Sequence, residues 1–111
     1  MKREELLKNC EGFDWDEANE LKNWDKHSVK KTEAEQVFFN MPLVVSETYA
    51  TTDSDRYLAL GKTNDGRLLT VIFTLRKKKL IRVISARDMS RKERKAYDEI
   101  NKENSKIQVR R

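Results

Sequence analysis

A run of nine residues in the second half of the chain, RLLTVIFTL at 67–75, most constrains the fold. The run is almost entirely apolar and is rich in β-branched residues, which favour strands. Because the apolar residues are consecutive rather than alternating, both faces of such a strand need to be covered. The run therefore predicts a central strand buried within a sheet.

Shorter apolar segments on either side of this run predict the strands that flank it. Residues 43–45 and 56–62 precede the run and residues 80–86 follow it, with turn sequences at 63–66 and 76–79. Short turns between successive strands favour antiparallel pairing. We therefore expect an antiparallel meander of three or four strands.

Two helices are predicted before these strands. Apolar residues recur with a period near 3.6 in the first of them: Ala18, Leu21 and Trp24. Asp14 or Asp16 can cap the start of this helix. The sequence TEAE at 32–35 has the form of a capping box, which predicts the start of the second helix, and Pro42 lies beyond its end.

A third helix is predicted after the last strand. It begins at the capping-box sequence SRKE at 90–93, and its inner side is formed by Ala96, Tyr97 and Ile100. Three helices and a meander predict an α+β, two-layer domain with the helices on one face of the sheet.

The chain length fits one domain over 1–111, since 111 residues are too few for two. We expect a core at 13–103, an N-terminal extension at 1–12 and a basic tail at 104–111.

Composition excludes several classes of protein. With 39% charged residues and a mean hydropathy of −0.89, the core must be small. No apolar run approaches the roughly 20 residues that span a bilayer, and the first dozen residues do not resemble a signal peptide. We therefore expect a cytoplasmic protein. One cysteine and one histidine allow no disulfide and no zinc cluster, and we expect neither a metal nor another cofactor.

The charge is distributed unevenly along the chain. Residues 1–55 carry 7 basic and 13 acidic side chains, whereas residues 56–111 carry 17 basic and 6 acidic ones. This asymmetry favours a surface in the second half that faces a polyanion. The alternative is that the acidic first half simply offsets the basic second half on the folded surface.

Basic residues of the last strand form the most informative pattern. Arg82 alternates with apolar residues, and a buried arginine needs an anion, either a carboxylate of the same chain or a phosphate. Arg87 and Ser85 follow, just before a helix whose N-terminus attracts anions. Together they predict a phosphodiester site. Strict alternation would place Arg82 and Ser85 on opposite faces, so their convergence requires either a β-bulge or a position at the rim of the sheet.

Two further groups of basic residues each have two interpretations. His27 follows Lys26 at the end of the first helix, where a histidine either stabilises the helix end or takes part in acid–base catalysis. The turn RKKK at 76–79 is either solvated or a phosphate contact.

Several segments follow one another in the order of one protein family: FDWD at 13–16, KHSV at 26–29, Phe38 to Pro42, RYLALG at 56–61, ISAR at 84–87, and Glu93-Arg94 with Tyr97. In this order and spacing they resemble the BrnT family, the ribonuclease toxins of bacterial BrnT/BrnA type II toxin–antitoxin systems. The resemblance covers residues 13 to about 99.

This resemblance implies a RelE-like α+β fold, cleavage of RNA without a metal, and neutralisation by a cognate BrnA-like antitoxin in a hetero-oligomer. It points to catalysis by Lys26, His27, Arg82, Ser85 and Arg87. The expected RNA- or phosphate-binding residues are Arg56, Arg76, Lys77, Lys78, Lys79, Arg91, Arg94 and Tyr97. The alternative is a catalytically weak RelE-like protein that mainly binds its antitoxin or nucleic acid.

The sequence departs from the family pattern beside the expected site. Ser28 stands where the family usually has a glycine, which would end the first helix in a left-handed conformation. Asp88 stands where a basic residue is usual.

Overall fold

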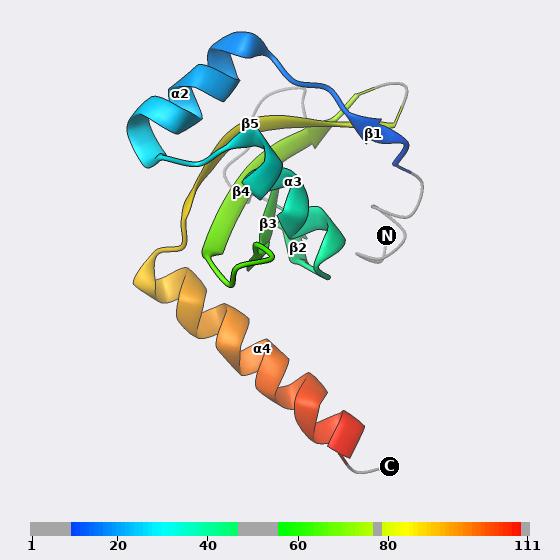
Figure 1. Cartoon of the computed structure of the whole chain (residues 1–111). Coiled ribbons are helices and arrows are strands. Elements are labelled where there is room, and N and C mark those ends of the chain that lie inside the picture. Colours follow the sequence, from blue (N-terminus) through cyan, green and yellow to red (C-terminus); the bar gives the residue numbers. More distant parts are fainter. Residues whose placement is uncertain (1–9, 47–55, 77–78, 110–111) are drawn as a thin grey trace.

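The computed structural model describes residues 10–46, 56–76 and 79–109. In these residues the sheet has five strands in the order β1-β5-β4-β3-β2 (Figure 1). The strands are β1 (Gly12–Phe13), β2 (Leu43–Ser46), β3 (Tyr57–Lys62), β4 (Leu68–Leu75) and β5 (Leu80–Asp88). Strands β2 to β5 form the expected antiparallel meander, with β4 at its centre. The short edge strand β1 adds a parallel pairing with β5, so the sheet is mixed and has one strand more than the meander predicts.

The helices are α2 (Glu17–His27), α3 (Lys31–Phe39) and α4 (Arg91–Val109). The start of α2 is capped as predicted, because Asp16 Oδ1 accepts a hydrogen bond from the Ala18 amide at 2.9 Å. The capping box of α4 is also confirmed: the Ser90 amide donates to Glu93 Oε1 at 2.8 Å, and the Glu93 amide donates to Ser90 Oγ at 3.2 Å.

The predicted capping box at 32–35 is wrong. The capping box lies two residues earlier, at 30–33, since the Lys30 amide donates to Glu33 Oε1 at 2.9 Å, and helix α3 begins at Lys31. Glu35 lies further along the helix, where it accepts a hydrogen bond from Trp15 Nε1 at 2.8 Å. The Glu35 carboxylate, which the local pattern placed in the capping box, is therefore used in a tertiary contact with Trp15 instead.

A serine ends α2 in the left-handed conformation that the family's glycine would adopt. Ser28 has φ 53° and ψ 40°, and its amide donates to Trp24 O at 2.9 Å. The Val29 amide donates to Asn23 O at 3.3 Å, and the buried Val29 side chain anchors the turn. The bond from Ser28 to Trp24 makes this arrangement an αL-type helix stop, formed here without glycine.

The main core lies between the sheet and the two helices α2 and α3. Its largest members come from β4, which contributes Leu69, Val71 and Phe73 with no exposed surface. The Phe38 ring of α3 meets the Phe73 ring edge-on, with centroids 5.0 Å apart. The predicted central strand therefore forms the middle of the core.

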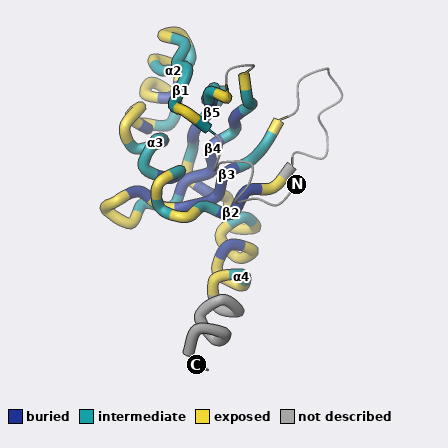
Figure 2. Tube along the Cα trace, turned by 90° about the vertical axis from the view of Figure 1, so that its right-hand side faces the viewer, coloured by how far each residue is buried: buried dark blue, intermediate teal, exposed yellow. Residues whose placement is uncertain are grey.

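The expectation that all helices lie on one face is wrong for α4. Tyr97 packs in a second, smaller cluster with Leu43, Leu60 and Met89, on the opposite face of the sheet. Leu60 reaches this face because alternate residues of a strand point to opposite sides. Ala96, expected on the inner side, is exposed. Figures 1 and 2 show that α4 extends away from the sheet beyond its first turns. The helix continues to Val109 and so includes most of the segment 104–111 that was expected to be a basic tail.

Strand β5 contains a β-bulge, which is one of the two arrangements that the sequence pattern allowed. Ile72 is paired with Ser85 and Phe73 with Val83, so Ile84 has no partner on β4. The extra residue changes the alternation of side chains along β5.

Because directly paired residues point to the same side of a sheet, the pairings of β4 with β5 show which side chains share a face. Thr70, Ile72 and Thr74 of β4 are opposite Arg87, Ser85 and Arg82. These six residues lie on the side away from α2 and α3. We call this side, where α4 does not cover it, the open face.

Candidate nucleic-acid interface

At the helix end of the open face, Arg87 is held by Glu93. The two guanidinium nitrogens Nη1 and Nη2 donate to the two carboxylate oxygens at 2.8 and 2.9 Å. Glu93 Oε1 also accepts hydrogen bonds from Thr70 Oγ1 at 2.9 Å and from the Ser90 amide. The anion beside this helix N-terminus is therefore a carboxylate of the chain itself. We call Arg87, Glu93, Thr70 and Ser90 the helix-end group.

The electrostatics of the helix-end group follow from these contacts. The hydrogen bond from Arg87 is the main cause that lowers the pKa of Glu93 to about 2, and the bonds from Ser90 and Thr70 add to it. The same pair raises the pKa of Arg87. Both side chains are therefore charged at neutral pH, and Arg87 has a fixed orientation.

At the opposite end of β5, Arg82 is paired with two aspartates. Its Nη1 lies 3.4 Å from Asp14 Oδ2 and its Nη2 lies 3.2 Å from Asp16 Oδ2. Arg76 Nε lies 3.5 Å from the same oxygen of Asp14. The sequence predicted that Arg82 pairs either with a carboxylate of the same chain or with a phosphate. In the structure it pairs with two carboxylates of the same chain. We call Asp14, Asp16, Arg76 and Arg82 the strand-start group.

The structure does not bring Arg82 and Arg87 to one point. They are five residues apart on β5, which at 3.3 Å per residue separates their Cα atoms by about 16 Å. Ser85 lies between them on the same face. The two arginines therefore do not form a single anion site, and each is paired with carboxylates of the chain.

The C-terminal end of α2 is fixed by Arg67, which the sequence did not single out. Arg67 Nη2 donates to His27 O at 3.0 Å, Nη1 donates to Ser28 O at 2.8 Å, and Nε donates to Asp88 Oδ1 at 2.9 Å. The hydrogen bond from Arg67 is the main cause that lowers the pKa of Asp88, and electrostatic interactions with Arg67, His27 and Arg94 add to it. The negative charge of Asp88 is therefore compensated locally.

The remaining predicted residues are distributed around these groups. Lys26 is exposed at the end of α2, and His27 beside it is half-buried. Five of the predicted phosphate contacts are exposed: Arg56, Arg76, Lys79, Arg91 and Arg94. Tyr97 is buried in the smaller core. Lys77 and Lys78 lie outside the described residues.

The sequence reasoning missed the carboxylates that hold the arginines. The capping box does predict that Glu93 lies at the start of α4, close to Arg87, but it does not predict the pairing of the two side chains. Asp14 and Asp16 were assigned only to capping, and nothing local linked them to Arg82, which lies 66 residues or more away.

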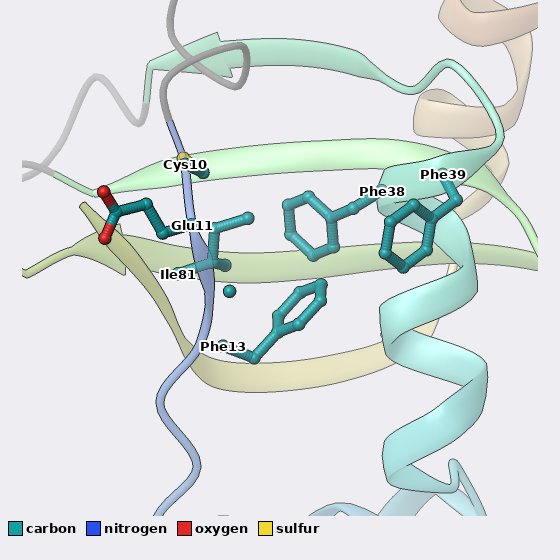
Figure 3. A pocket seen from close by; sticks show the side chains of 7 residues that line it. Cys10, Glu11, Phe13, Phe38, Phe39 and Ile81 are labelled. Atoms are coloured by element: carbon teal, nitrogen blue, oxygen red, sulfur yellow. The ribbon is translucent and has the colours of Figure 1, made fainter.

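An apolar cavity of about 260 Å³ lies elsewhere, between β1 and the end of α3 (Figure 3). Phe13, Phe38, Phe39 and Ile81 form most of its lining, together with Cys10, Glu11 and Gly12. None of the predicted site residues lines this cavity.

Within the described part of the chain, no three His, Cys, Asp or Glu side chains cluster as metal ligands. Among the described helices, none is long and apolar enough to span a membrane.

Comparison with known proteins points to one family. Residues 15–93 match the family model described as "Ribonuclease toxin, BrnT, of type II toxin-antitoxin system". The chain is also similar to the crystal structure of the Brucella abortus ribonuclease toxin BrnT, with a TM-score of 0.58 and 28% sequence identity. That similarity covers 72% of this chain and 97% of the Brucella chain. No curated protein matches.

Proposed function

Because the chain belongs to the BrnT family of ribonuclease toxins of type II toxin–antitoxin systems, we propose that it cleaves RNA along its open face, without a metal ion, and so stops translation. The observation that supports this assignment is the β-bulge at Ile84. It places Arg82, Ser85 and Arg87 on one face that α2 and α3 leave uncovered. An extended row of positive groups and a hydroxyl is suited to the backbone of a single RNA strand.

In this proposal the chemistry is the attack of a ribose 2′-hydroxyl on the adjacent phosphodiester. The attack produces a 2′,3′-cyclic phosphate and a free 5′-hydroxyl. Arg87, already oriented by Glu93, stabilises the extra negative charge on the phosphorus centre. Arg82 binds a neighbouring phosphate, and Lys26 with His27 supplies positive charge and proton transfer from the end of α2.

The proposal includes a partner and a place of action. A BrnA-like antitoxin forms a hetero-oligomer with this chain and covers the basic surface of its second half. Since messenger RNA and ribosomes are the targets of a toxin that stops translation, the protein acts in the cytoplasm.

The test is cleavage of RNA by the purified chain in the presence of EDTA. We expect RNA fragments with 5′-hydroxyl ends, and a loss of at least about 100-fold in rate for Arg87→Gln, as for the removal of one charge-stabilising group in other enzymes. Arg82→Gln should weaken binding and cleavage as well. Lys22→Gln, which removes an exposed positive charge on α2 away from the open face, is the matched control and should cleave normally.

Two outcomes would contradict the proposal. Cleavage that needs a divalent metal would exclude the metal-independent mechanism. Intact RNA with the wild-type chain, together with unaffected growth on strong expression, would favour the binding-module alternative. One observation is in keeping with that alternative: Arg82 and Arg87 are both paired with carboxylates of the chain, with which RNA would have to compete.

A further inference from the structure

Helix α2 packs with its polar side inward. Its only buried side chain is Asn23, which is 2% exposed and whose Oδ1 accepts a hydrogen bond from the Ala86 amide of β5 at 3.1 Å. The apolar residues Leu21 and Trp24 are 63% and 50% exposed. This is the reverse of an ordinary surface helix, whose apolar stripe faces the core.

The two exposed apolar residues form one patch. Leu21 and Trp24 are three residues apart and therefore lie on the same side of the helix. Exposed carboxylates flank them at the i−4 and i+4 positions from Leu21, namely Glu17 and Asp25. In Figure 1, α2 lies at the outside of the molecule. We call Glu17, Leu21, Trp24 and Asp25 the α2 patch.

We propose that the α2 patch is the docking site for an amphipathic helix of the antitoxin, with apolar side chains three or four residues apart and Lys or Arg beside them. The proposal rests on the proposed function only in taking a protein antitoxin as the partner. Tryptophan is the residue type most typical of the energetic centre of protein interfaces. Basic flanking residues follow from the two carboxylates, because opposite charges around an apolar centre direct association.

The charges of the α2 patch argue against other occupants. RNA would be repelled by Glu17 and Asp25. A second copy of this chain, paired antiparallel through the same patch, would bring Asp25 of each copy near Glu20 of the other. Both arrangements place like charges together, whereas a basic amphipathic helix does not.

The position of the α2 patch connects docking with inhibition. Trp24 lies less than one turn before Lys26 and His27, at the end of α2 that Arg67 fixes beside Asp88. A helix bound along α2 therefore reaches the proposed catalytic residues Lys26 and His27 at the end of α2. The rest of the antitoxin can then extend over the open face.

The experiment compares two double variants of the full-length chain. Leu21→Ser with Trp24→Ser removes the apolar centre of the α2 patch. Phe39→Ser with Met41→Ser is the matched control, because these residues are 76% and 91% exposed and lie away from α2. Binding is measured by calorimetry against the purified product of the neighbouring gene, used as the antitoxin. RNA cleavage by each free variant is measured in parallel.

We expect the α2 double variant to bind the antitoxin about 30-fold more weakly or worse, as for the loss of an interface hot spot. The control should bind as the wild type does, and both variants should cleave RNA at the wild-type rate. Glu17→Lys with Asp25→Lys should also weaken binding. A circular dichroism spectrum identical to that of the wild type shows that each variant is folded.

Equal affinity of the α2 double variant and the wild type would overturn the inference, as would no binding of the wild type. A change in the sedimentation of the free chain, with antitoxin binding unaltered, would instead assign the patch to self-association. Loss of RNA cleavage by the free variant would assign it to the catalytic machinery. The antitoxin affinity of the variants therefore tests the docking site, whereas RNA cleavage by the wild-type chain tests the proposed function.

Discussion

At the residue scale, Glu93 shows how one side chain can serve a helix and a functional residue together. Its carboxylate completes the capping box of α4 with Ser90 and at the same time holds Arg87 and Thr70. The Glu93 side chain is only 18% exposed, so water weakens these contacts little. Glu93 therefore couples the stability of the helix start to the orientation of Arg87.

This coupling predicts a pH dependence of stability. The pKa of Glu93 is about 2 in the folded chain and near its ordinary 4.5 in the unfolded chain, so between these values only the unfolded chain binds the proton. The contribution of Glu93 is complete above about pH 4.5 and is lost as the pH falls towards 2. Glu93→Gln should remove about 3 kcal/mol of the rise in unfolding free energy across this window, measured by urea unfolding at several pH values.

The control for this prediction is Glu99→Gln, which changes an exposed carboxylate of the same helix. Its stability should follow the wild-type pH profile. If Glu93→Gln also follows that profile, the Glu93 contacts do not contribute to stability.

At the element scale, Arg67 joins segments that the chain keeps far apart. Its guanidinium contacts the end of α2 through two carbonyls, the end of β5 through Asp88, and α3 through Glu33 at 3.4 Å. Carbonyls at a helix end lack partners within the helix, so a positive group there is favourable. Through these contacts the segment with Lys26 and His27 is held next to β5.

We predict that Arg67→Lys lowers the free energy of unfolding by about 2 kcal/mol, because a lysine cannot reproduce the planar set of donors. Arg76→Lys is the control: Arg76 is 54% exposed, with one ion pair at 3.5 Å, and its replacement should change stability by less than about 0.5 kcal/mol. Urea unfolding at pH 7 measures both. Equal effects of the two variants would mean that the Arg67 contacts have no special role.

At the scale of the whole molecule, the uneven charge should govern how the antitoxin arrives. Residues 56–111, which form β3 to α4, carry 11 more basic than acidic side chains. Residues 1–55, which include α2 and α3, carry 6 more acidic than basic side chains. Charges steer association over distances of about one Debye length, which is about 10 Å at 0.1 M salt and about 3 Å at 1 M.

We therefore predict that the association rate of the antitoxin falls by at least about 10-fold between 0.05 and 1 M salt, and that the saturated complex no longer cleaves RNA. Stopped-flow fluorescence gives the rate, and the dissociation rate serves as an internal control because it should change much less. An antitoxin that binds equally fast at both salt concentrations, or a saturated complex that still cleaves RNA, would show that the basic surface is not what it covers.

Local sequence determined most of the fold. The central position of 67–75, the neighbouring strands and the caps at Asp16 and Ser90 all follow from residues close together in the chain, because periodicity and capping act over a few residues. Spacing alone also indicated that either a bulge or a rim position must bring Arg82 and Ser85 to one side, and the structure shows the bulge. The sequence therefore specified which basic residues share a strand and a helix start.

Tertiary structure decided what those residues contact and which sides of the helices are exposed. The pairing of Arg82 with Asp14 joins residues 68 positions apart, and the Arg67 contacts join three separate segments. Helical period indicated that Leu21 and Trp24 share a side of α2, but the hydrogen bond between Asn23 and Ala86 turned that side outward. Such contacts depend on how distant segments pack, which no local pattern of residues encodes.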